Sequence, residues 1–392
     1  MVASAFGTIA APLLRRGFSA SDGKVAEPID YQMPAWGVAL IVSTLLVFAA
    51  ADFMVQYTYS RIIPTLLMVE SPQAILFEPI KSDDPDAKVD PQEVELCLVK
   101  QAPITSSFRS TVQHLRAKGG KLAIFRGLSM SIVSAIVFQW YIGFFSSFIP
   151  MMFAHFMAMV LSAPFYLAWT TIVISNPSPL PWYKRMPNLA TVKKIMIPTA
   201  HFALAKELTI MLPLYLARSY GFHEMNPEDC MNMGKNEFTM TFAKALSVLV
   251  LAGALAFSIY IPANVILTRV QASLLPETDE AIVPFDRTFG GKVVAEEVGG
   301  TGALGMLDAW RTFDRSSRVR LLKAYAKVFA MEVALGFAFT ALIISEIFMI
   351  VGTDLSKFNL DSQFAAILNL ELYVEDVHGW RLNIGDESGL CI

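Results

Sequence analysis

The chain has few charged residues for its length. Asp, Glu, Lys and Arg make up 17% of its 392 residues, against roughly 25% in soluble globular domains. Hydrophobic residues make up 54%, and the mean hydropathy is +0.49. This composition excludes an ordinary soluble domain and favours a protein of the lipid bilayer. The net charge of −3 offers no basic face to phosphates, which argues against a nucleic-acid-binding protein.

Cysteine is equally scarce. Cys97, Cys230 and Cys391 lie far apart and form no Cys-x-x-Cys or Cys/His pattern, so neither a disulfide framework nor a zinc site is indicated. A pairing of Cys230 with Cys391 stays open. The sequence also lacks a nucleophile elbow, a His-Glu-x-x-His motif and paired carboxylates on one helix face. We therefore expect no enzyme, no catalytic residue, no metal and no cofactor.

Long hydrophobic runs, in contrast, are abundant. Because a transmembrane helix needs roughly 20 mainly apolar residues, the sequence predicts six spans. They cover residues 35–67, 127–150, 152–175, 195–219, 238–271 and 322–352. Several exceed the length that a bilayer requires, which indicates tilted or kinked helices. We expect an all-α membrane protein with six transmembrane helices.

Positive charge is concentrated in alternate connections. Residues 69–124, 176–194 and 272–321 carry most of the Lys and Arg, whereas the other two connections contain only Lys235. Positively charged loops tend to face the more negative compartment. The sequence therefore predicts that these three loops lie on one side of the membrane and both termini on the other.

One short segment closes a long apolar run with a proline. Residues 262–271 read PANVILTRVQ, and a proline at this place bends the helix axis. Weaker copies are residues 50–55 and 164–169, in which Asp52, Tyr166 and Asn264 are equivalent, 114 and 98 residues apart. A period near one hundred residues indicates three internal repeats.

These segments resemble the signature of the mitochondrial carrier superfamily, Pro-x-Asp/Glu-x-x-Lys/Arg-x-Arg-x-Gln. The first copy adds an amphipathic stretch at residues 108–116, Gly119 and Gly120, and an aromatic-Arg-Gly entry at residues 125–127. The resemblance implies the carrier fold, three pseudo-repeats of two helices, in a mitochondrial membrane, the inner rather than the outer. The implied units are an N-terminal arm 1–34, repeats 35–150, 151–220 and 221–357, and a polar tail 358–392.

The departures from the signature are as informative as the matches. In the family, as the resemblance implies, acidic and basic members of the signature form ion pairs that close the matrix side of a central cavity. This chain has only Asp52 at the three acidic positions, and Val55, Trp169 and Leu267 at the three basic ones. The usual ring of ion pairs cannot form here. The signature positions that we single out are Asp52, Pro164, Tyr166, Trp169, Pro262, Asn264, Arg269 and Gln271.

Polar residues inside the predicted spans are the candidates for binding a solute, because such residues are costly in a bilayer. They are Ser134, His201, Lys206, Glu207 and Glu332. We expect Lys206 and Glu332 to pair across the cavity. A lone His such as His201 is more often bonded to its neighbours than to a ligand. The resemblance also implies bound lipid, cardiolipin in particular, and Gly120, Arg126 and Gly127 are the candidates for holding it.

Two functions follow from different classes. In the first, the protein translocates a small zwitterionic or apolar metabolite. In the second, the carrier scaffold no longer transports and acts as a membrane adaptor in organelle dynamics or protein insertion, with loops 69–124 and 272–321 as docking surfaces. The acidic segments 82–90 and 276–280 then contact partners, or they are simply solvated. Residues 1–21 resemble a targeting presequence, although an exposed arm explains them equally well.

Overall fold

The computed structural model describes residues 34–71, 76–77, 98–99, 103–178, 181–223, 225, 233–294 and 298–351. Most of the predicted N-terminal arm, the predicted tail 358–392, the acidic segment 82–90 and the three cysteines lie outside the described residues.

Nearly all the described chain is helical. The main helices are α2 (Ala35–Met54), α3 (Ile63–Val69), α4 (Phe108–Gly119), α5 (Leu128–Ser146), α6 (Met151–Leu161), α7 (Ala163–Ile174), α8 (Leu189–Ser219), α10 (Lys235–Leu255), α11 (Ile261–Ser273), α12 (Met306–Arg311) and α13 (Arg315–Val351). Two π-helical segments, η1 (Val55–Ile62) and η5 (Ala256–Tyr260), join α2 to α3 and α10 to α11. Short 3-10 helices are η2 (Ile104–Ser106), η3 (Lys121–Phe125) and η4 (Trp182–Arg185), and β1 (Leu76–Phe77) pairs antiparallel with β2 (Leu98–Val99).

Five continuous helices are long and apolar enough to cross a membrane, and α6 with α7 forms a sixth candidate that bends by 51°. These segments match the six predicted runs closely. The prediction of a largely α-helical membrane protein is confirmed at this level.

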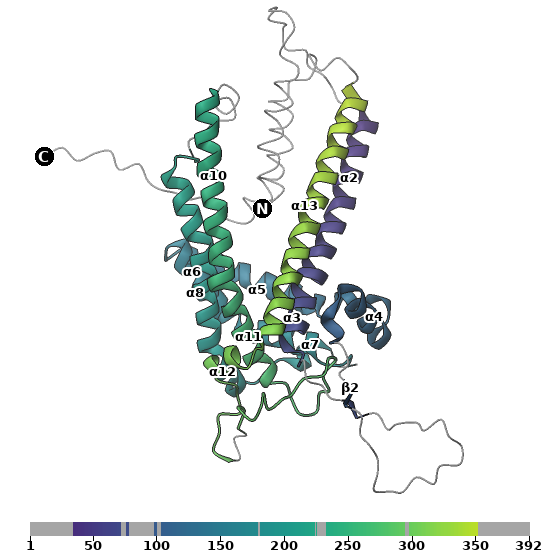
Figure 1. Ribbon diagram of the computed structural model, residues 1–392, viewed down its shortest axis with the longest axis vertical. Helices are drawn as coiled ribbons and strands as arrows, with labels where there is room; N and C mark the ends of the chain where they lie inside the picture. The colour runs from purple at the N-terminus through teal and green to yellow at the C-terminus, as the bar shows by residue number, and fades with distance from the viewer. Residues whose placement is uncertain are drawn as a thin grey trace, which may run out of the picture.

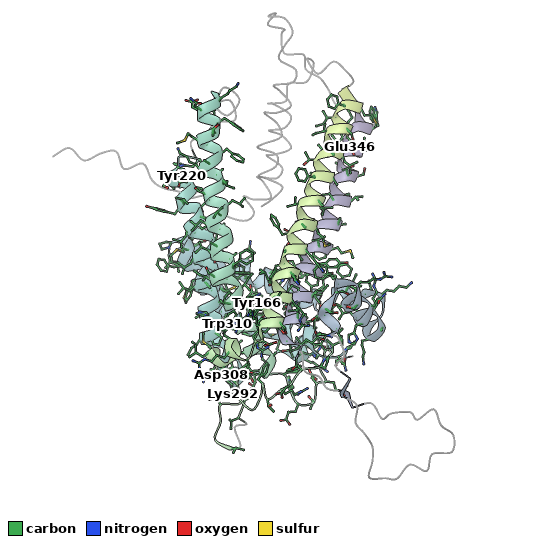
Figure 2. The ribbon with its side chains drawn as sticks, viewed as in Figure 1. Tyr166, Tyr220, Lys292, Asp308, Trp310 and Glu346 are labelled. Atoms are coloured by element: carbon green, nitrogen blue, oxygen red, sulfur yellow. The ribbon has the colours of Figure 1, made fainter. Side chains whose placement is uncertain are left out.

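The spans form two groups that meet at one end (Figure 1). Helix α13 packs along α2, whereas α6, α8 and α10 pack together on the opposite side. The groups converge around α3, α7 and α11, which contact one another pairwise. In Figure 2, Tyr166 lies at the level of this convergence and Glu346 lies near the far end of α13. We call the convergence of α3, α7 and α11 the closed end.

A proline stands at the same place in each of the three converging segments. Pro64, Pro164 and Pro262 are each the second residue of their helix, α3, α7 and α11. A proline cannot donate to the carbonyl four residues earlier, and its ring crowds that carbonyl. Before Pro64 and Pro262 the helix widens into the π-helical segments η1 and η5. Before Pro164 the chain instead bends at Ser162, between α6 and α7. Each proline thus follows an irregular stretch of helix at the point where its segment enters the closed end, and a bend of 51° is recorded at the middle one.

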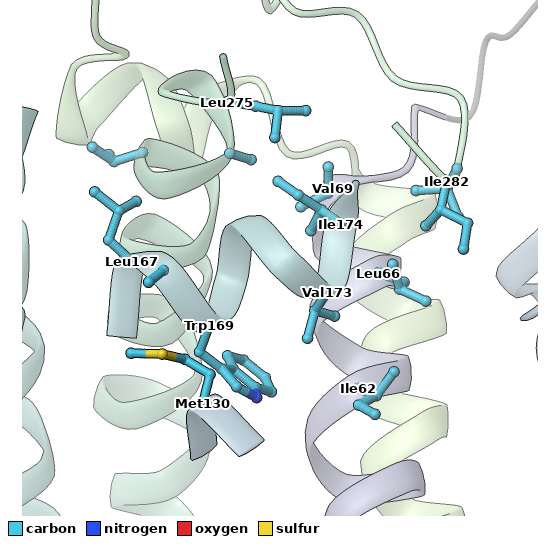
Figure 3. Close-up of a cluster of buried hydrophobic side chains, with 14 of the residues drawn as sticks. Ile62, Leu66, Val69, Met130, Leu167, Trp169, Val173, Ile174, Leu275 and Ile282 are labelled. Atoms are coloured by element: carbon cyan, nitrogen blue, oxygen red, sulfur yellow. The ribbon is translucent and has the colours of Figure 1, made fainter. Parts of the chain in front are cut away.

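The largest apolar cluster lies at the closed end (Figure 3). Ile62 and Leu66 of the first span pack with Leu167, Val173 and Ile174 of α7, all almost fully buried. Burying each such side chain contributes about 1.5–3 kcal/mol. The closed end is therefore the best-packed part of the helix assembly, in contrast to α10, which has no buried residue.

The three predicted basic loops meet at this same end. The Ser71 amide donates to the Pro284 carbonyl at 3.1 Å, and the Asn176 amide donates to the Glu280 carbonyl at 2.7 Å. An isolated β-bridge joins Ser175 to Ala281. The loops therefore lie on one side of the assembly, as predicted.

The connection after α11 is not a uniformly solvated loop. Glu277 and Glu280 are exposed, as that interpretation predicts. The residues that follow turn inward, however, and Ile282, Val283 and Phe289 are buried against the cluster at the closed end. We call residues 275–293 the covering loop, because they lie over the ends of α3 and α7.

Candidate functional site

Arg269 connects three segments of the closed end. Its guanidinium donates to the Met68 carbonyl at the end of α3 and to the Thr312 hydroxyl, each at 2.9 Å. It also lies over the rings of Phe289 and Phe313, at 4.8 and 5.4 Å from their centres. The residue is only 6% exposed. A signature position that was predicted from sequence is therefore an anchor between α11, α3 and the segment after α12.

Neutral hydrogen bonds complete the contacts between the three spans. Gln271 of α11 accepts from the Thr170 hydroxyl of α7 at 2.7 Å. Trp169 of α7 donates to the Tyr57 hydroxyl of η1 at 3.2 Å, and that hydroxyl donates to the Arg126 carbonyl at 2.9 Å. Trp169, which stands at one of the predicted basic positions, and Gln271, the predicted signature glutamine, therefore make neutral hydrogen bonds between spans.

Glu70 ties the first span to two other segments at the same level. Its carboxylate accepts from the amides of Ile104 and Thr105, at 2.6 and 3.1 Å, and from the Thr105 hydroxyl. Arg320, near the start of α13, lies 3.5 Å away. Glu70 is 2% exposed, so these donors compensate a carboxylate that would otherwise be costly to bury. The closed end thus also holds α13 and the segment before α4.

The structure corrects the predicted alignment of the first repeat. Pro64 occupies the place of Pro164 and Pro262, so Leu66 and not Asp52 is equivalent to Tyr166 and Asn264. Asp52 lies in α2, three turns before α3. The prediction failed because it required an acidic residue after the bend, and this copy has none.

Arg61 is a cation between the spans that the sequence analysis overlooked. Its guanidinium donates to the Ser131 hydroxyl of α5 at 3.0 Å. It also lies 4.8 Å from the centre of the Trp169 ring and 5.9 Å from that of Tyr57. Arg61 is exposed even though α5 and α7 surround it. The signal was present in the sequence, since Arg61 is the one charged residue between Phe53 and Val69.

Lys206 and Glu207 lie on α8, facing α5 and α6. The Lys206 amine is 5.7 Å from the centre of the Phe138 ring. Glu207 is buried, with one oxygen 3.7 Å from the His155 imidazole. These two predicted solute residues are thus brought together with His155, which the sequence analysis did not single out.

The predicted pair of Lys206 with Glu332 is wrong. Glu332 lies on α13 and accepts a hydrogen bond from the Gln56 amide of η1 at 2.9 Å. No ion pair joins Glu332 to Lys206 in the described part of the chain. The reason is the packing: α13 packs on the first span, whereas α8 packs on α6 and α10.

The remaining predicted positions have separate environments. Ser134 is buried, and its hydroxyl donates to the Ser131 carbonyl of its own helix at 2.8 Å, so it is not available to a solute. His201 is exposed on α8. Asn264 donates to the Tyr325 hydroxyl of α13 at 3.3 Å.

A pocket of about 300 Å³ lies beside the start of α5. Two of the predicted lipid-binding residues, Arg126 and Gly127, line it together with Arg185. The third, Gly120, follows the last residue of α4 with φ 76° and does not line the pocket. Arg126 donates to the carbonyls of Ile172 and Ser175 at the end of α7. Gly127 has φ 73°, and a Cβ there would lie 3.3 Å from the Trp169 ring. The pocket therefore presents two cations outside the apolar cluster.

In the covering loop, a carboxylate outside the spans fixes a tight turn. Although partial burial acts in the opposite direction, hydrogen bonds from the Gly290 amide and from the Thr288 hydroxyl and amide hold the pKa of Asp286 below its usual value of 3.8. Arg287, the next residue, donates to the carbonyls of Pro276 and Asp279. Asp279 in turn pairs with Arg185 at 2.9 Å. The loop is thus ordered by its own charges and tied to the connection after α7.

The comparisons give no relative: no protein-family model matches the chain, and no curated protein matches it. Among the described residues, no group of three His, Cys, Asp or Glu side chains could hold a metal ion. The geometry itself offers two things, a firmly packed closed end and a set of polar side chains between the spans above it.

Proposed function

We propose that this chain is a divergent protein of the mitochondrial carrier type that moves a small solute across a mitochondrial membrane, the inner rather than the outer. The observation that carries the proposal is the pairwise packing of α3, α7 and α11, each of which begins with a proline at the same position. Three equivalent elements that close one end of a membrane assembly are what a threefold carrier requires.

The nature of the closure agrees with a gate that opens. A transporter must break the contacts at its closed end in each cycle, and so they cannot be too strong. A neutral hydrogen bond contributes about 0.5–1.5 kcal/mol net, and the contacts Thr170–Gln271 and Trp169–Tyr57 are of this kind. Arg269 and Glu70 are the exceptions, because each is a buried charged group with more than one hydrogen-bond partner. The opening step therefore depends mainly on whether Arg269 and Glu70 are released.

Polar side chains in the interior give a solute something to bind. Arg61 and Gln56 come from the first span and Lys206 comes from α8, and each contacts a side chain of another span. Ionisable groups placed among membrane spans generally mark a pathway for a solute or an ion. A membrane scaffold that binds no solute has no such requirement for polar side chains between its spans.

The test is a thermal-shift screen of the purified protein in detergent against a library of metabolites, because a ligand that binds only the folded protein raises its apparent stability. Solutes that give a saturable shift are then loaded into liposomes for uptake assays. We expect Pro262→Ala, which restores a regular helix before α11, to insert normally but to change the uptake rate.

The alternative function has its own outcome in the same experiment. If lipids stabilise the protein but no solute does, and liposomes with the natural chain take up nothing, the chain is a membrane adaptor built on this scaffold. Loops 69–124 and 272–321 would then be its docking surfaces. Fractionation of mitochondria, with protease added to intact and ruptured organelles, tests the proposed membrane in parallel.

A further inference from the structure

The covering loop, residues 275–293, is bonded to segments that lie far from it in the sequence. Its Ile282 amide donates to the carbonyl of Ile174, the last residue of α7, at 2.8 Å, and the Ile282 carbonyl accepts from the His114 imidazole of α4 at 2.8 Å. The Ser71 amide, two residues beyond α3, donates to the loop at 3.1 Å. Because the loop begins two residues after α11, it joins the ends of all three helices that converge at the closed end.

Apolar side chains of the loop cover the same helix ends. In Figure 3, Leu275 and Ile282 of the loop lie beside Val69 and Ile174, the last residues of α3 and α7. All four side chains are buried, and the most exposed of them, Leu275, is only 6% exposed. A path between α3, α7 and α11 would therefore leave the helix assembly underneath this loop.

Phe289 holds the far end of the loop in a strained conformation. Its φ is 50°, and among the residues that the structure describes it is the one non-glycine residue with a positive φ, a conformation that a residue with a Cβ seldom adopts. The centre of its buried ring lies 4.8 Å from the Arg269 guanidinium and 5.9 Å from the centre of the Phe285 ring. Backbone strain persists only where the surroundings enforce it, and it is concentrated at clamps and switch regions. The loop is therefore held in place by its contacts and is more than a connection between two helices.

The attachments of the loop to the three helices differ in kind. At α3, α4 and α7 they are hydrogen bonds, the isolated bridge between Ser175 and Ala281, and the ion pair of Asp279 with Arg185 at 2.9 Å. At α11 the attachment is the chain itself, which cannot be released. Three helices cannot separate while one loop is bonded to the end of each. Any separation of α3, α7 and α11 therefore requires the loop to leave α3 or α7.

We propose that the covering loop is a lid on the closed end. When α3, α7 and α11 separate, the loop leaves α3, α4 and α7 and moves with α11. When the helices converge again, the loop returns and bars the path on this side, and the ion pair of Arg185 with Asp279 is its latch. The proposal rests on the proposed function, since the lid bars the path of the transported solute, but its motion can be measured without any solute.

The first experiment locks the lid with a disulfide. Two backbone hydrogen bonds flank the bridge between Ser175 and Ala281, so these residues form a non-hydrogen-bonded antiparallel pair, whose Cα atoms lie about 4.5 Å apart. Natural disulfides join Cα atoms that are about 4.4–6.8 Å apart. The variant combines Ser175→Cys with Ala281→Cys in the full chain, with its three native cysteines replaced by serine, and we expect it to form the disulfide under mild oxidation.

Amide hydrogen exchange of the oxidised and reduced forms is then compared by mass spectrometry. We expect oxidation to slow exchange in α3 and α11 about tenfold, equivalent to about 1.4 kcal/mol, because these helix ends exchange when the closed end opens and the disulfide prevents that opening. Neither helix carries a cysteine of the pair. Helix α10, which has no buried residue, reports any general effect of the cross-link and should change much less. Unchanged exchange in α3 and α11, or equal slowing in α10, would overturn the proposal.

The second experiment opens the latch and needs no disulfide. Asp279→Asn should speed exchange in α3 and α11 about twofold to fivefold, as expected for the loss of a partly exposed ion pair. The matched control is Glu277→Gln, which removes an exposed carboxylate two residues away and should leave exchange unchanged. Equal effects of the two substitutions would contradict the proposal. This comparison decides the question if the double-cysteine variant does not fold.

Uptake separates the lid from the transport function. A solute found by the thermal-shift screen should enter liposomes that contain the reduced double-cysteine variant, but not those that contain the oxidised form. Equal uptake by both forms would overturn the lid and leave transport standing. If exchange behaves as expected but the natural chain takes up no solute, the covering loop still moves as a lid and the transport function fails.

Discussion

Replacement of Arg269 is the sharpest test of how the closed end is held. The side chain makes two hydrogen bonds at 2.9 Å, one to the Met68 carbonyl and one to the Thr312 hydroxyl, and lies over two aromatic rings. Hydrogen bonds to a charged group contribute about 1.5–3 kcal/mol each, and each cation–π contact about 0.5–1 kcal/mol. The cost of burying the guanidinium offsets part of this sum. We expect Arg269→Gln to destabilise the protein by about 3–5 kcal/mol, the part of this sum that remains after the offset.

The assay is thermal unfolding of purified protein in detergent, followed by tryptophan fluorescence. At about 1.2 °C per kcal/mol for a chain of 392 residues, Arg269→Gln should lower the midpoint by about 4–6 °C. Arg269→Lys keeps the charge but loses the planar guanidinium fork. Its unfolding midpoint should therefore lie between that of the natural chain and that of Arg269→Gln. Arg311→Gln, an exposed arginine of α12, is the matched control. Midpoints of Arg269→Gln and Arg311→Gln that agree within 2 °C would refute the anchoring role.

Two further substitutions test other parts of the structure. Gly127→Ala should lower the unfolding midpoint, since a φ of 73° costs an L-residue about 1–2 kcal/mol and the new Cβ would lie 3.3 Å from the Trp169 ring. The control is Gly143→Ala, which should be neutral or stabilising because its Cβ would meet open space. Equal midpoint changes in the two variants would contradict the argument. Asp286 has a folded-state pKa below 3.8, so its stabilisation is complete above that value and is lost as the pH falls through the lowered folded-state pKa. The midpoint difference between the natural chain and Asp286→Asn should therefore stay constant from pH 7 to pH 5 and shrink below 3.8; a difference that instead grows toward low pH would reverse the sign.

Hydrophobic runs predicted the spans well because a bilayer imposes a simple length and composition on each helix. The bend beside Pro164 and the irregular helix before Pro262 could likewise be expected from the sequence, since proline acts on the local backbone whatever surrounds it. The equivalence of Pro64 was missed because the first repeat was aligned on its acidic residue, Asp52. Only the packing of α3 against α7 and α11 shows that Leu66 stands at the position where the signature has an acidic residue.

Side-chain partners were the harder problem. Lys206 and Glu332 have opposite charges and lie on spans that a threefold arrangement places near each other, so a pair was a natural hypothesis. Which spans pack together depends on the sum of many apolar contacts, and these place Glu332 beside Gln56 and Lys206 beside Phe138. The burial of the covering loop was equally hard to predict, because its first residues include exposed acidic side chains. The buried residues Ile282, Val283 and Phe289 follow them.

The contacts of the closed end also bear on the order in which the chain can assemble. Arg269 bonds a carbonyl 201 residues earlier, and Arg320 reaches a carboxylate 250 residues earlier. When the first span enters the membrane, the Met68 carbonyl and the Glu70 carboxylate therefore still lack these two partners, which lie near the other end of the sequence. Pairings this distant form late and leave partly folded chains prone to misassembly. The first span must then be protected by lipid or by an assembly factor until α11 and α13 have been inserted, and a chain truncated before residue 261 should be degraded rather than accumulate as a smaller folded unit.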